Sequence, residues 1–310
     1  MRLVFMGTPE FAVRSLETLH NSAHEIVAVV TAADKPRGRG RKVTPSPVKQ
    51  AALAMNLPIL QPKNLKSPDF IQKLSEYQPD LNVIVAFRIL PESVFKLPRL
   101  GSVNLHGSLL PKYRGAAPIN WAVINGETKT GVTTFLLDKK VDTGAMLMQE
   151  EIEITPEDDA GSIHDKMMAI GADLLLQTVD ALESGTIRPE PQSNSGATPA
   201  PKLTPETGRL DWSRPAVELF NLIRGLSPYP GAYSTLCGKK IIILKCNLIE
   251  MNNAGDPGKI ITADPKTGIT VACGRNALKI IALKPQGKKI MSSEEFVRGY
   301  HVQNGHRFEF

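Results

Sequence analysis

Two polar side chains with complementary chemistry lie two positions apart in the middle of the chain. Asn104 and His106 are separated by Leu105 and followed at once by Gly107, which ends an apolar run. Residues i and i+2 of a strand point the same way, so we expect the carboxamide and the imidazole to project side by side. Asp142 follows in a polar loop between two apolar runs. These groups could hold an oxyanion, move a proton and orient the proton carrier.

The same residues have plainer interpretations. Asn and His at a strand end are often turn formers whose side chains bond nearby backbone groups. Asp142 belongs to the turn-forming run Asp142-Thr143-Gly144, and Asp138 in the same loop competes with it as the acid. Placement favours catalysis, because ligands bind beyond the carboxyl ends of strands in open α/β sheets.

The elements that would position these residues form an α/β pattern. A helix is expected over about 9–20, with Pro9 in its first turn and Thr8 as its N-cap. A long amphipathic helix is expected over 162–183. Apolar runs predict strands over 2–7, 26–31, 80–86, 102–105, 131–137 and 145–154. Buried runs without alternation indicate a mostly parallel sheet.

The pattern changes after a segment rich in Pro, Ser and Asn. Residues 189–206 have linker composition, which separates an N-terminal domain over 1–188 from a C-terminal domain over 207–310. Trp212 and Tyr229 are expected in the core of the second domain. After one helix near 216–224, short strands recur over 240–244, 258–262, 269–272 and 278–283. Recurrent short strands without intervening helices predict a small β-barrel.

Length and composition exclude several classes of protein. A chain of 310 residues, 42% hydrophobic and 22% charged, is typical of a globular protein. No apolar run reaches the length of a transmembrane helix, and no signal peptide or import leader is evident, so we expect a bacterial cytoplasmic protein without membrane association. Cys237, Cys246 and Cys273 fit no zinc spacing and are expected to be buried, and no metal site is predicted.

The net charge of +6 is unevenly distributed. Residues 203–310 contain fifteen Lys or Arg against nine Asp or Glu, whereas residues 1–202 contain twenty-two of each. A second basic segment, 34–49, has six Lys or Arg and one Asp, and it lacks the glycine pattern of nucleotide-binding loops. The excess indicates a polyanionic partner, although basic surfaces also serve solubility alone.

The polar residues belong to a longer pattern. Asn104, His106, the run Ser108 to Pro111 and Asp142 resemble the Asn…His-x-Ser-Leu-Leu-Pro…Asp pattern of the folate-dependent formyltransferases. The resemblance implies a Rossmann-like catalytic domain followed by an OB-like barrel. It also implies that Asn104, His106 and Asp142 are catalytic and that 10-formyltetrahydrofolate is the formyl donor.

Two flanking runs, Phe5 to Ala12 and Lys112 to Trp121, resemble the family branch that acts on methionyl-tRNA. Many family members have Gly where this chain has Arg88, and an Arg-Ile-Leu run occurs in the glycinamide ribonucleotide branch. The residues implied to bind the folate are Phe87, Arg88, Ile89, Leu90, Ser108, Leu109, Leu110, Pro111, Lys140 and Val141.

Basic residues in two places could contact RNA. The methionyl-tRNA branch carries a basic insertion at 34–49 that reaches the tRNA acceptor end, and basic loops on an OB-like barrel are a usual nucleic-acid surface. Solvated loops are the plainer alternative in both places. The residues expected to bind tRNA are Arg37, Arg39, Arg41, Lys42, Lys239, Lys240, Lys288 and Lys289.

We therefore predict a monomeric enzyme that transfers the formyl group of 10-formyltetrahydrofolate to the α-amino group of methionyl-initiator tRNA, for translation initiation. An amino-sugar or nucleotide-sugar formyltransferase would share the catalytic residues, but it would not need the basic segment or the basic C-terminal third. A tRNA-binding protein with a decayed catalytic site would not need an intact Asn104, His106 and Asp142.

Overall fold

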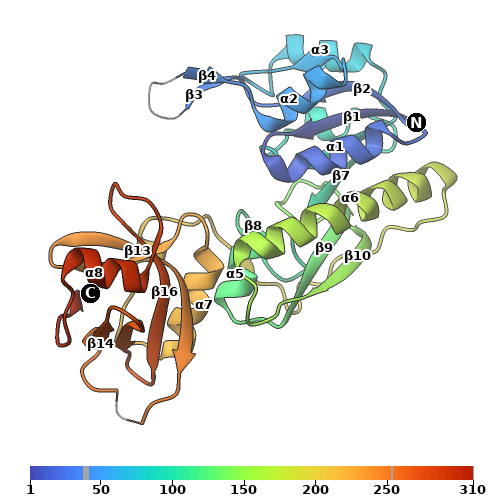
Figure 1. The fold of residues 1–310 in the computed structure, drawn as a ribbon. Helices are drawn as coiled ribbons and strands as arrows, with labels where there is room; N and C mark the ends of the chain where they lie inside the picture. Colours follow the sequence, from blue (N-terminus) through green and yellow to red (C-terminus); the bar gives the residue numbers. More distant parts are fainter. Residues whose placement is uncertain (38–41, 253, 310) are drawn as a thin grey trace. The chain divides into compact units, whose positions relative to one another are not determined.

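The computed structural model describes residues 1–37, 42–252 and 254–309, in two compact units. The first unit comprises Met1–Pro118, Lys129–Glu153 and His164–Ala200. The second comprises Ile119–Thr128, Ile154–Ile163 and the chain from Pro201 onward. Figure 1 shows an α/β arrangement in the first unit and a mainly β arrangement in the second.

The first unit is built on a seven-stranded sheet in the order β10-β9-β7-β6-β1-β2-β5. Strands β5, β2, β1, β6 and β7 run parallel, and β9 and β10 are antiparallel. The strands are β1 (Arg2–Gly7), β2 (Glu25–Val30), β5 (Ile59–Leu60), β6 (Leu81–Val85), β7 (Ser102–His106), β9 (Lys129–Leu136) and β10 (Met146–Glu153). The mostly parallel, Rossmann-like sheet predicted from the apolar runs is confirmed.

Helices pack on both faces of this sheet. Phe70, Leu74, Val94 and Phe95 of α3 and α4 join the apolar core over one face. On the other face α6 approaches β7 so closely that a Cβ at Gly171 would lie 2.9 Å from the Leu105 side chain. The helices of this unit are α1 (Val13–His20), α2 (Pro47–Ala54), α3 (Pro68–Glu76), α4 (Glu92–Phe95) and most of α6 (Ala160–Ser184), whereas α5 (Pro118–Ile124) falls almost wholly in the second unit.

Local sequence explains where several helices begin. Ser46 and Ser67 accept hydrogen bonds from backbone N–H groups of α2 and α3, and a proline follows each serine. The helix expected at 9–20 instead begins as a 3-10 turn, η1 (Glu10–Ala12), with no side-chain cap, so the prediction for Thr8 is wrong. Two small two-stranded sheets complete the unit, formed by β3 (Lys35–Arg37) with β4 (Lys42–Thr44) and by β8 (Arg114–Gly115) with β11 (Pro199–Ala200).

The second unit is an antiparallel sheet in the order β14-β15-β16-β13-β12-β18, with β17 beside β16. The sheet closes on itself, because Ile260 N donates to His306 O (2.7 Å) and Phe308 N donates to Gly258 O (2.8 Å). This closure confirms the barrel expected from short recurrent strands. Its elements are η2 (Glu206–Gly208), α7 (Ala216–Leu226), β12 (Ala232–Leu236), β13 (Lys239–Ile249), β14 (Ile260–Asp264), β15 (Gly268–Ala272), β16 (Ala277–Pro285), β17 (Met291–Ser292), α8 (Ser293–Tyr300) and β18 (Phe308–Glu309).

The exposure of side chains in the barrel confirms some predictions of burial and contradicts others. Trp212 is fully buried, donates from Nε1 to Ser234 Oγ (3.0 Å) and packs against Phe308. Cys246 and Cys273 are buried as expected. Tyr229 is 84% exposed, and Cys237 lies exposed in a turn, so both predictions of burial are wrong. An apolar neighbourhood in sequence does not determine which side of a tight turn faces solvent.

Two kinds of feature are absent from the part of the chain that the structure describes. No helix there is long and apolar enough to cross a membrane. No group of three or more His, Cys, Asp or Glu side chains there could hold a metal ion.

Candidate active site

The predicted catalytic residues lie at the carboxyl edge of the first sheet. Register brings the ends of three parallel strands together, since Gly7 of β1 pairs with Val85 of β6, and Val85 pairs with Leu105 of β7. Asn104 and His106 occupy alternate positions at the end of β7 and therefore share one face. Beyond this edge the chain leaves each strand in a loop, which is the usual ligand-binding position in such sheets.

The His106 ring is held on two sides. Nε2 lies 2.9 Å from the carbonyl oxygen of Tyr113, and Nδ1 lies 3.9 Å from Oδ2 of Asp142. Because a carbonyl only accepts, Nε2 carries a proton in this arrangement. The ring is 7% exposed and meets Phe135 edge to face. Its Nδ1 is thus the nitrogen that faces the acid.

Asn104 is half-buried, and its side chain forms no hydrogen bond with any residue that the structure describes. A carboxamide carries two N–H donors, which water or a bound molecule can use. The unpaired donors distinguish Asn104 from Asn82 on the neighbouring strand, whose Nδ2 is bonded to Val94 O (3.0 Å) and Ser102 Oγ (3.1 Å).

The loop after β9 brings Asp142 to the histidine. Oδ2 of Asp142 accepts a hydrogen bond from Gly115 N (2.8 Å), and its backbone has φ 53°, the left-handed region. Two residues on, a Cβ at Gly144 would lie 1.7 Å from the Leu136 carbonyl oxygen, so only glycine fits there. Asp138, the competing acid, is exposed and accepts from Lys139 N (2.7 Å). The structure therefore brings Asp142 to His106.

The turn from Ser108 to Pro111 is tied down from within. Ser108 donates to Lys112 O (2.7 Å), and Thr133 Oγ1 donates to Ser108 O (2.6 Å). Gln149 Nε2 donates to Leu110 O (2.9 Å). Ser108 and Leu110 are buried, whereas Leu109 and Pro111 are half-buried. The turn is a rigid wall beside His106.

The other predicted folate residues lie on two loops that leave apolar groups exposed. Ile89 is 78% exposed and Val141 51% exposed, and Lys140 is exposed as well. Leu90 is buried and Phe87 half-buried. Arg88 extends over the Phe87 ring at 5.2 Å and donates to Pro62 O (2.9 Å), so its side chain braces the loop that follows β6.

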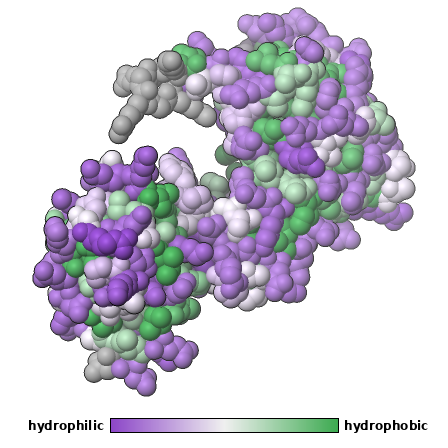
Figure 2. Space-filling view, viewed as in Figure 1, coloured by the Kyte–Doolittle hydropathy of each residue, from purple (hydrophilic) through white to green (hydrophobic). Residues whose placement is uncertain are grey.

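The four lysines predicted on the barrel lie in two connected segments. Lys239 and Lys240 begin β13, and Lys288 and Lys289 lie between β16 and β17. The two segments are joined where Gln286 N donates to Lys240 O (3.0 Å). All four side chains are exposed, and Nζ of Lys240 lies 3.5 Å from the centroid of the Tyr233 ring. The visible face of this unit is mostly hydrophilic (Figure 2).

The basic segment of the first unit is described in part. Arg37 and Lys42 lie in the paired strands β3 and β4, whereas Arg39 and Arg41 lie outside the described residues. The base of this hairpin is fixed by a polar cluster, in which Lys49 Nζ donates to Asp34 Oδ2 (2.6 Å) and to Gln61 Oε1 (2.8 Å). The hydrogen bond from Lys49, and after it the one that Gln61 Nε2 donates to Asp34 Oδ1 (2.9 Å), lower the pKa of Asp34.

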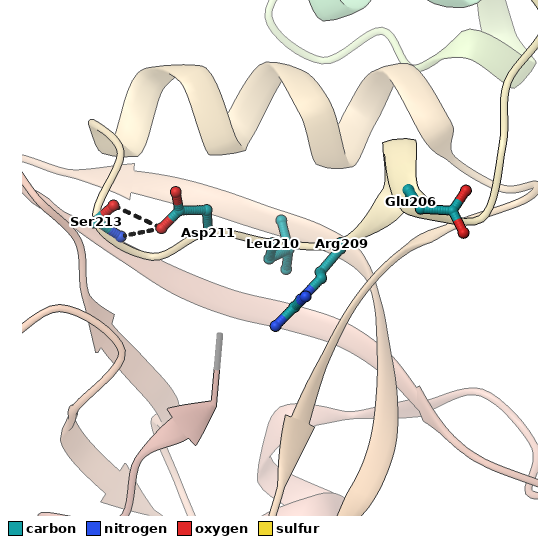
Figure 3. Close-up of a pocket in the computed structure, with 5 residues that line it drawn as sticks. All are labelled: Glu206, Arg209, Leu210, Asp211 and Ser213. Carbon is teal, nitrogen blue, oxygen red and sulfur yellow. Dashed lines mark hydrogen bonds between the residues drawn. The ribbon is translucent and has the colours of Figure 1, made fainter.

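A pocket of about 590 Å³ lies elsewhere, in the second unit, lined by Glu206, Arg209, Leu210, Asp211 and Ser213. Figure 3 shows Ser213 bonded to Asp211, and this hydrogen bond is the main reason that the pKa of Asp211 is lowered. None of the predicted site residues lines this pocket.

Several residues of the site were missed by sequence reasoning. Tyr113 contributes its backbone carbonyl, Thr133 and Gln149 fix the turn, and Gln192 contacts the Asp142 loop. A backbone carbonyl leaves no signal in residue type, and Gln192 lies in the stretch with linker composition. The only sequence signal for Tyr113 is its place in the run Lys112 to Trp121, which resembles the family branch that acts on methionyl-tRNA.

Comparison with known proteins agrees with this geometry. Residues 1–179 match the family model described as formyl transferase, and residues 202–301 match its C-terminal domain. A methionyl-tRNA formyltransferase of Caldanaerobacter subterraneus is 47% identical over 98% of this chain and 99% of its own length. One of Trichlorobacter lovleyi is 46% identical over 98% of this chain and 96% of its own.

Solved structures share the fold at lower identity. HypX from Aquifex aeolicus, in complex with tetrahydrofolic acid, superimposes with a TM-score of 0.66 at 19% identity, over 100% of this chain and 51% of HypX. WlaRD, a sugar 3N-formyl transferase, gives a TM-score of 0.67 at 17% identity, over 93% of this chain and 99% of its own.

Proposed function

Because this chain belongs to the formyl transferase family, we propose that it transfers the formyl group of 10-formyltetrahydrofolate to the α-amino group of methionine on initiator tRNA. The observation that carries the proposal is the grouping of Asn104, His106 and Asp142 at the carboxyl edge of the sheet. The acceptor is inferred from relatives that match almost the whole chain and are named methionyl-tRNA formyltransferases.

The surroundings of this edge suit a folate. The exposed apolar side chains of Ile89 and Val141 offer a surface for a flat ring system, and the rigid turn from Ser108 to Pro111 offers a wall. Backbone groups of the loop after β6 are available to bond the ring edges. No metal is required for this chemistry.

The reaction needs charge stabilisation on one oxygen. The lone pair of the methionyl amine attacks the formyl carbon, a C–N bond forms, and the carbonyl π electrons move to oxygen. The unpaired Asn104 carboxamide can donate to that oxyanion, as can the His106 ring when it is a cation. Donors aimed at charge that develops only in the transition state raise the rate without tightening substrate binding.

The contacts of His106 identify its reacting nitrogen. Since Nε2–H is occupied by the Tyr113 carbonyl, Nδ1 is the nitrogen left for substrate. Nδ1 can donate only when the ring is a cation, and the Asp142 carboxylate lies 3.9 Å from it. Asp142 or an ordered water then accepts the excess proton of the attacking amine. As the bond from the formyl carbon to folate N10 breaks, N10 takes up a proton.

The acceptor tRNA would be bound through charge. We assign it to Arg37, Arg39, Arg41 and Lys42, which belong to the same N-terminal domain as the catalytic residues, and to the barrel lysines of the C-terminal domain, residues 207–310. Such an enzyme acts as a monomer in the bacterial cytoplasm, where initiator tRNA is charged.

Two acceptors offered side by side test the proposal. Purified protein and 10-formyltetrahydrofolate are incubated with methionyl-initiator tRNA or with a free amino sugar, and formylated product is quantified. We expect transfer to the tRNA alone. Transfer to the sugar alone would overturn the acceptor assignment, and tRNA binding without any transfer would indicate a binding protein.

A further inference from the structure

Residues 190–200 form a strap across the candidate site, in the stretch whose composition predicted a linker. At one end Glu190 and Met146 exchange backbone hydrogen bonds of 2.8 and 2.7 Å. At the other end β11 pairs with β8, where Ala116 N donates to Ala200 O (2.7 Å). The strap belongs to the first unit, and the last segment of the second unit begins with the next residue, Pro201.

Gln192 uses both ends of its carboxamide to fix the Asp142 loop. Its Nε2 donates to the backbone oxygens of Asp142 (3.1 Å) and Gly144 (2.7 Å). Its Oε1 accepts from Nη2 (2.7 Å) and Nε (3.1 Å) of Arg114. Gln192 is half-buried, whereas Pro191 and Ser193 on either side are exposed. The contact holds Asp142 in its left-handed conformation, which the backbone alone disfavours.

Thr198 fixes the histidine through one intermediate residue. Its Oγ1 accepts from Tyr113 N (2.9 Å), and the carbonyl of Tyr113 accepts from His106 Nε2 (2.9 Å). Tyr113 has φ 61°, a left-handed conformation that is unfavourable for a residue with a side chain, so contacts with its neighbours must hold it. Strained residues held by their neighbours are a recurring feature of active sites.

We propose that Gln192 and Thr198 are positioning residues, through which the strap sets the placement of Asp142 and His106 for formyl transfer. This inference rests on the proposed function. Gln192 positions the loop that carries Asp142, and Thr198 positions the His106 ring through Tyr113. One segment of chain therefore fixes both side chains, whose Oδ2 and Nδ1 atoms lie 3.9 Å apart. Displacing a reacting group by a fraction of an ångström lowers turnover more than binding.

Gln192→Met keeps the size of the side chain and removes its hydrogen bonds. We expect kcat for methionyl-tRNA to fall about 10-fold or more, with KM for donor and tRNA changed by less than about 2-fold. Asn194→Ala is the matched control, since Asn194 also contacts Arg114 (3.1 Å) but no residue of the Asp142 loop. In an Asp142→Asn background, Gln192→Met should add little, because the two act as a unit. Full additivity, or an unchanged kcat, would overturn the role of Gln192.

Gln192→Glu supplies a second variant should the methionine protein fail to fold, because it keeps the acceptor for Arg114 and removes only the donors to the loop. It should show the same loss of kcat. Thermal melting of each variant separates loss of fold from loss of position.

Thr198→Val removes the acceptor for Tyr113, and Thr198→Ser restores it. The ¹⁵N spectrum of the histidine rings, with His106 assigned by its absence in His106→Ala, reports the Nε2–H bond without any substrate. We expect the His106 resonances to shift in Thr198→Val and to return in Thr198→Ser. His106 resonances that do not shift in Thr198→Val would refute the positioning role of Thr198. Wild-type protein that shows the expected spectrum but formylates no tRNA would refute the proposed function alone.

Discussion

The proposed catalytic edge, comprising Asn104, His106 and Asp142, and the barrel lysines are built in opposite ways. At the edge, His106 is buried and its Nε2 is hydrogen-bonded to the Tyr113 carbonyl. The Asp142 carboxylate in turn accepts a hydrogen bond from Gly115 N. Lys239 and Lys240 are exposed at the start of β13, and Lys288 and Lys289 are exposed between β16 and β17. Stabilising an oxyanion requires donors fixed before the reaction, whereas neutralising phosphates requires only charge within reach. Single substitutions should therefore have large effects at the edge and small, additive ones on the barrel.

The largest effects should come from the edge donors. His106→Ala or Asn104→Ala should lower kcat by about 10²-fold or more with the fold intact, the usual loss when a transition-state donor is removed. Single-turnover formylation measures this loss directly. His20→Ala, on the exposed end of α1, serves as the control and should retain full activity. Near-normal turnover in either edge variant would show that the donors lie elsewhere.

Replacement of Asp142 should have the next largest effect on kcat. Asp142→Asn keeps the geometry, including the bond from Gly115 N, but removes the carboxylate charge that faces His106 Nδ1. We expect a loss in kcat of about 10²-fold with little change in folate affinity, measured by steady-state kinetics and by folate titration. Asp138→Asn in the same loop is the matched control. A collapse of folate binding in Asp142→Asn would instead make this residue part of the pocket wall.

The fold could be predicted from sequence where burial alone determines structure. Strands β1, β2, β6 and β7 are short, buried and rich in apolar residues, and each was predicted to within about two residues. Helices α2 and α3 were not predicted, although both begin at a Ser-Pro pair. The short strand β12 was missed because Tyr233 and Thr235 alternate with buried residues in a segment dominated by turn formers.

The site could be predicted in residue types but not in backbone geometry. Motif spacing identified Asn104, His106 and Asp142, yet nothing in the sequence indicates that Tyr113 adopts a positive φ and turns its carbonyl toward a histidine. The contacts of Gln192 could not be predicted from the sequence for a related reason. Pro, Ser and Asn give a segment the composition of a linker whether it is solvated or hydrogen-bonded along a catalytic edge.

Smaller and graded effects are expected where charge alone acts. Replacing Lys239, Lys240, Lys288 and Lys289 with Gln should weaken tRNA binding and flatten its salt dependence, since each lost phosphate contact removes about 0.7–0.9 from the slope of log affinity against log salt. The hairpin set, Arg37, Arg39, Arg41 and Lys42, should behave alike in a parallel titration with labelled initiator tRNA. Neutralising exposed Lys66 and Lys73 provides the control. An unchanged slope for one set would leave RNA binding to the other.

The smallest expected effect is on the alkylation of a single thiol on the barrel. Cys237 lies exposed in the turn between β12 and β13, two residues before Lys239. Burial raises the pKa of the Cys273 thiol to about 12 and that of Cys246 further, so both stay protonated at pH 8. Because the thiolate is the reactive form, iodoacetamide should label Cys237 alone in native protein and all three cysteines in urea.

Bound tRNA should slow that labelling if the turn faces RNA. Mass spectrometry of Cys237 alkylation, with and without saturating initiator tRNA, is expected to show protection that disappears at a salt concentration where the complex dissociates. The Lys239, Lys240, Lys288 and Lys289 variant, at a tRNA concentration raised to saturate it, should lose much of this protection, because RNA held by the hairpin alone need not cover the turn. Equal labelling rates with and without saturating tRNA would remove the barrel lysines from the RNA interface. The hairpin would then account for the charge contacts that the salt titration reports.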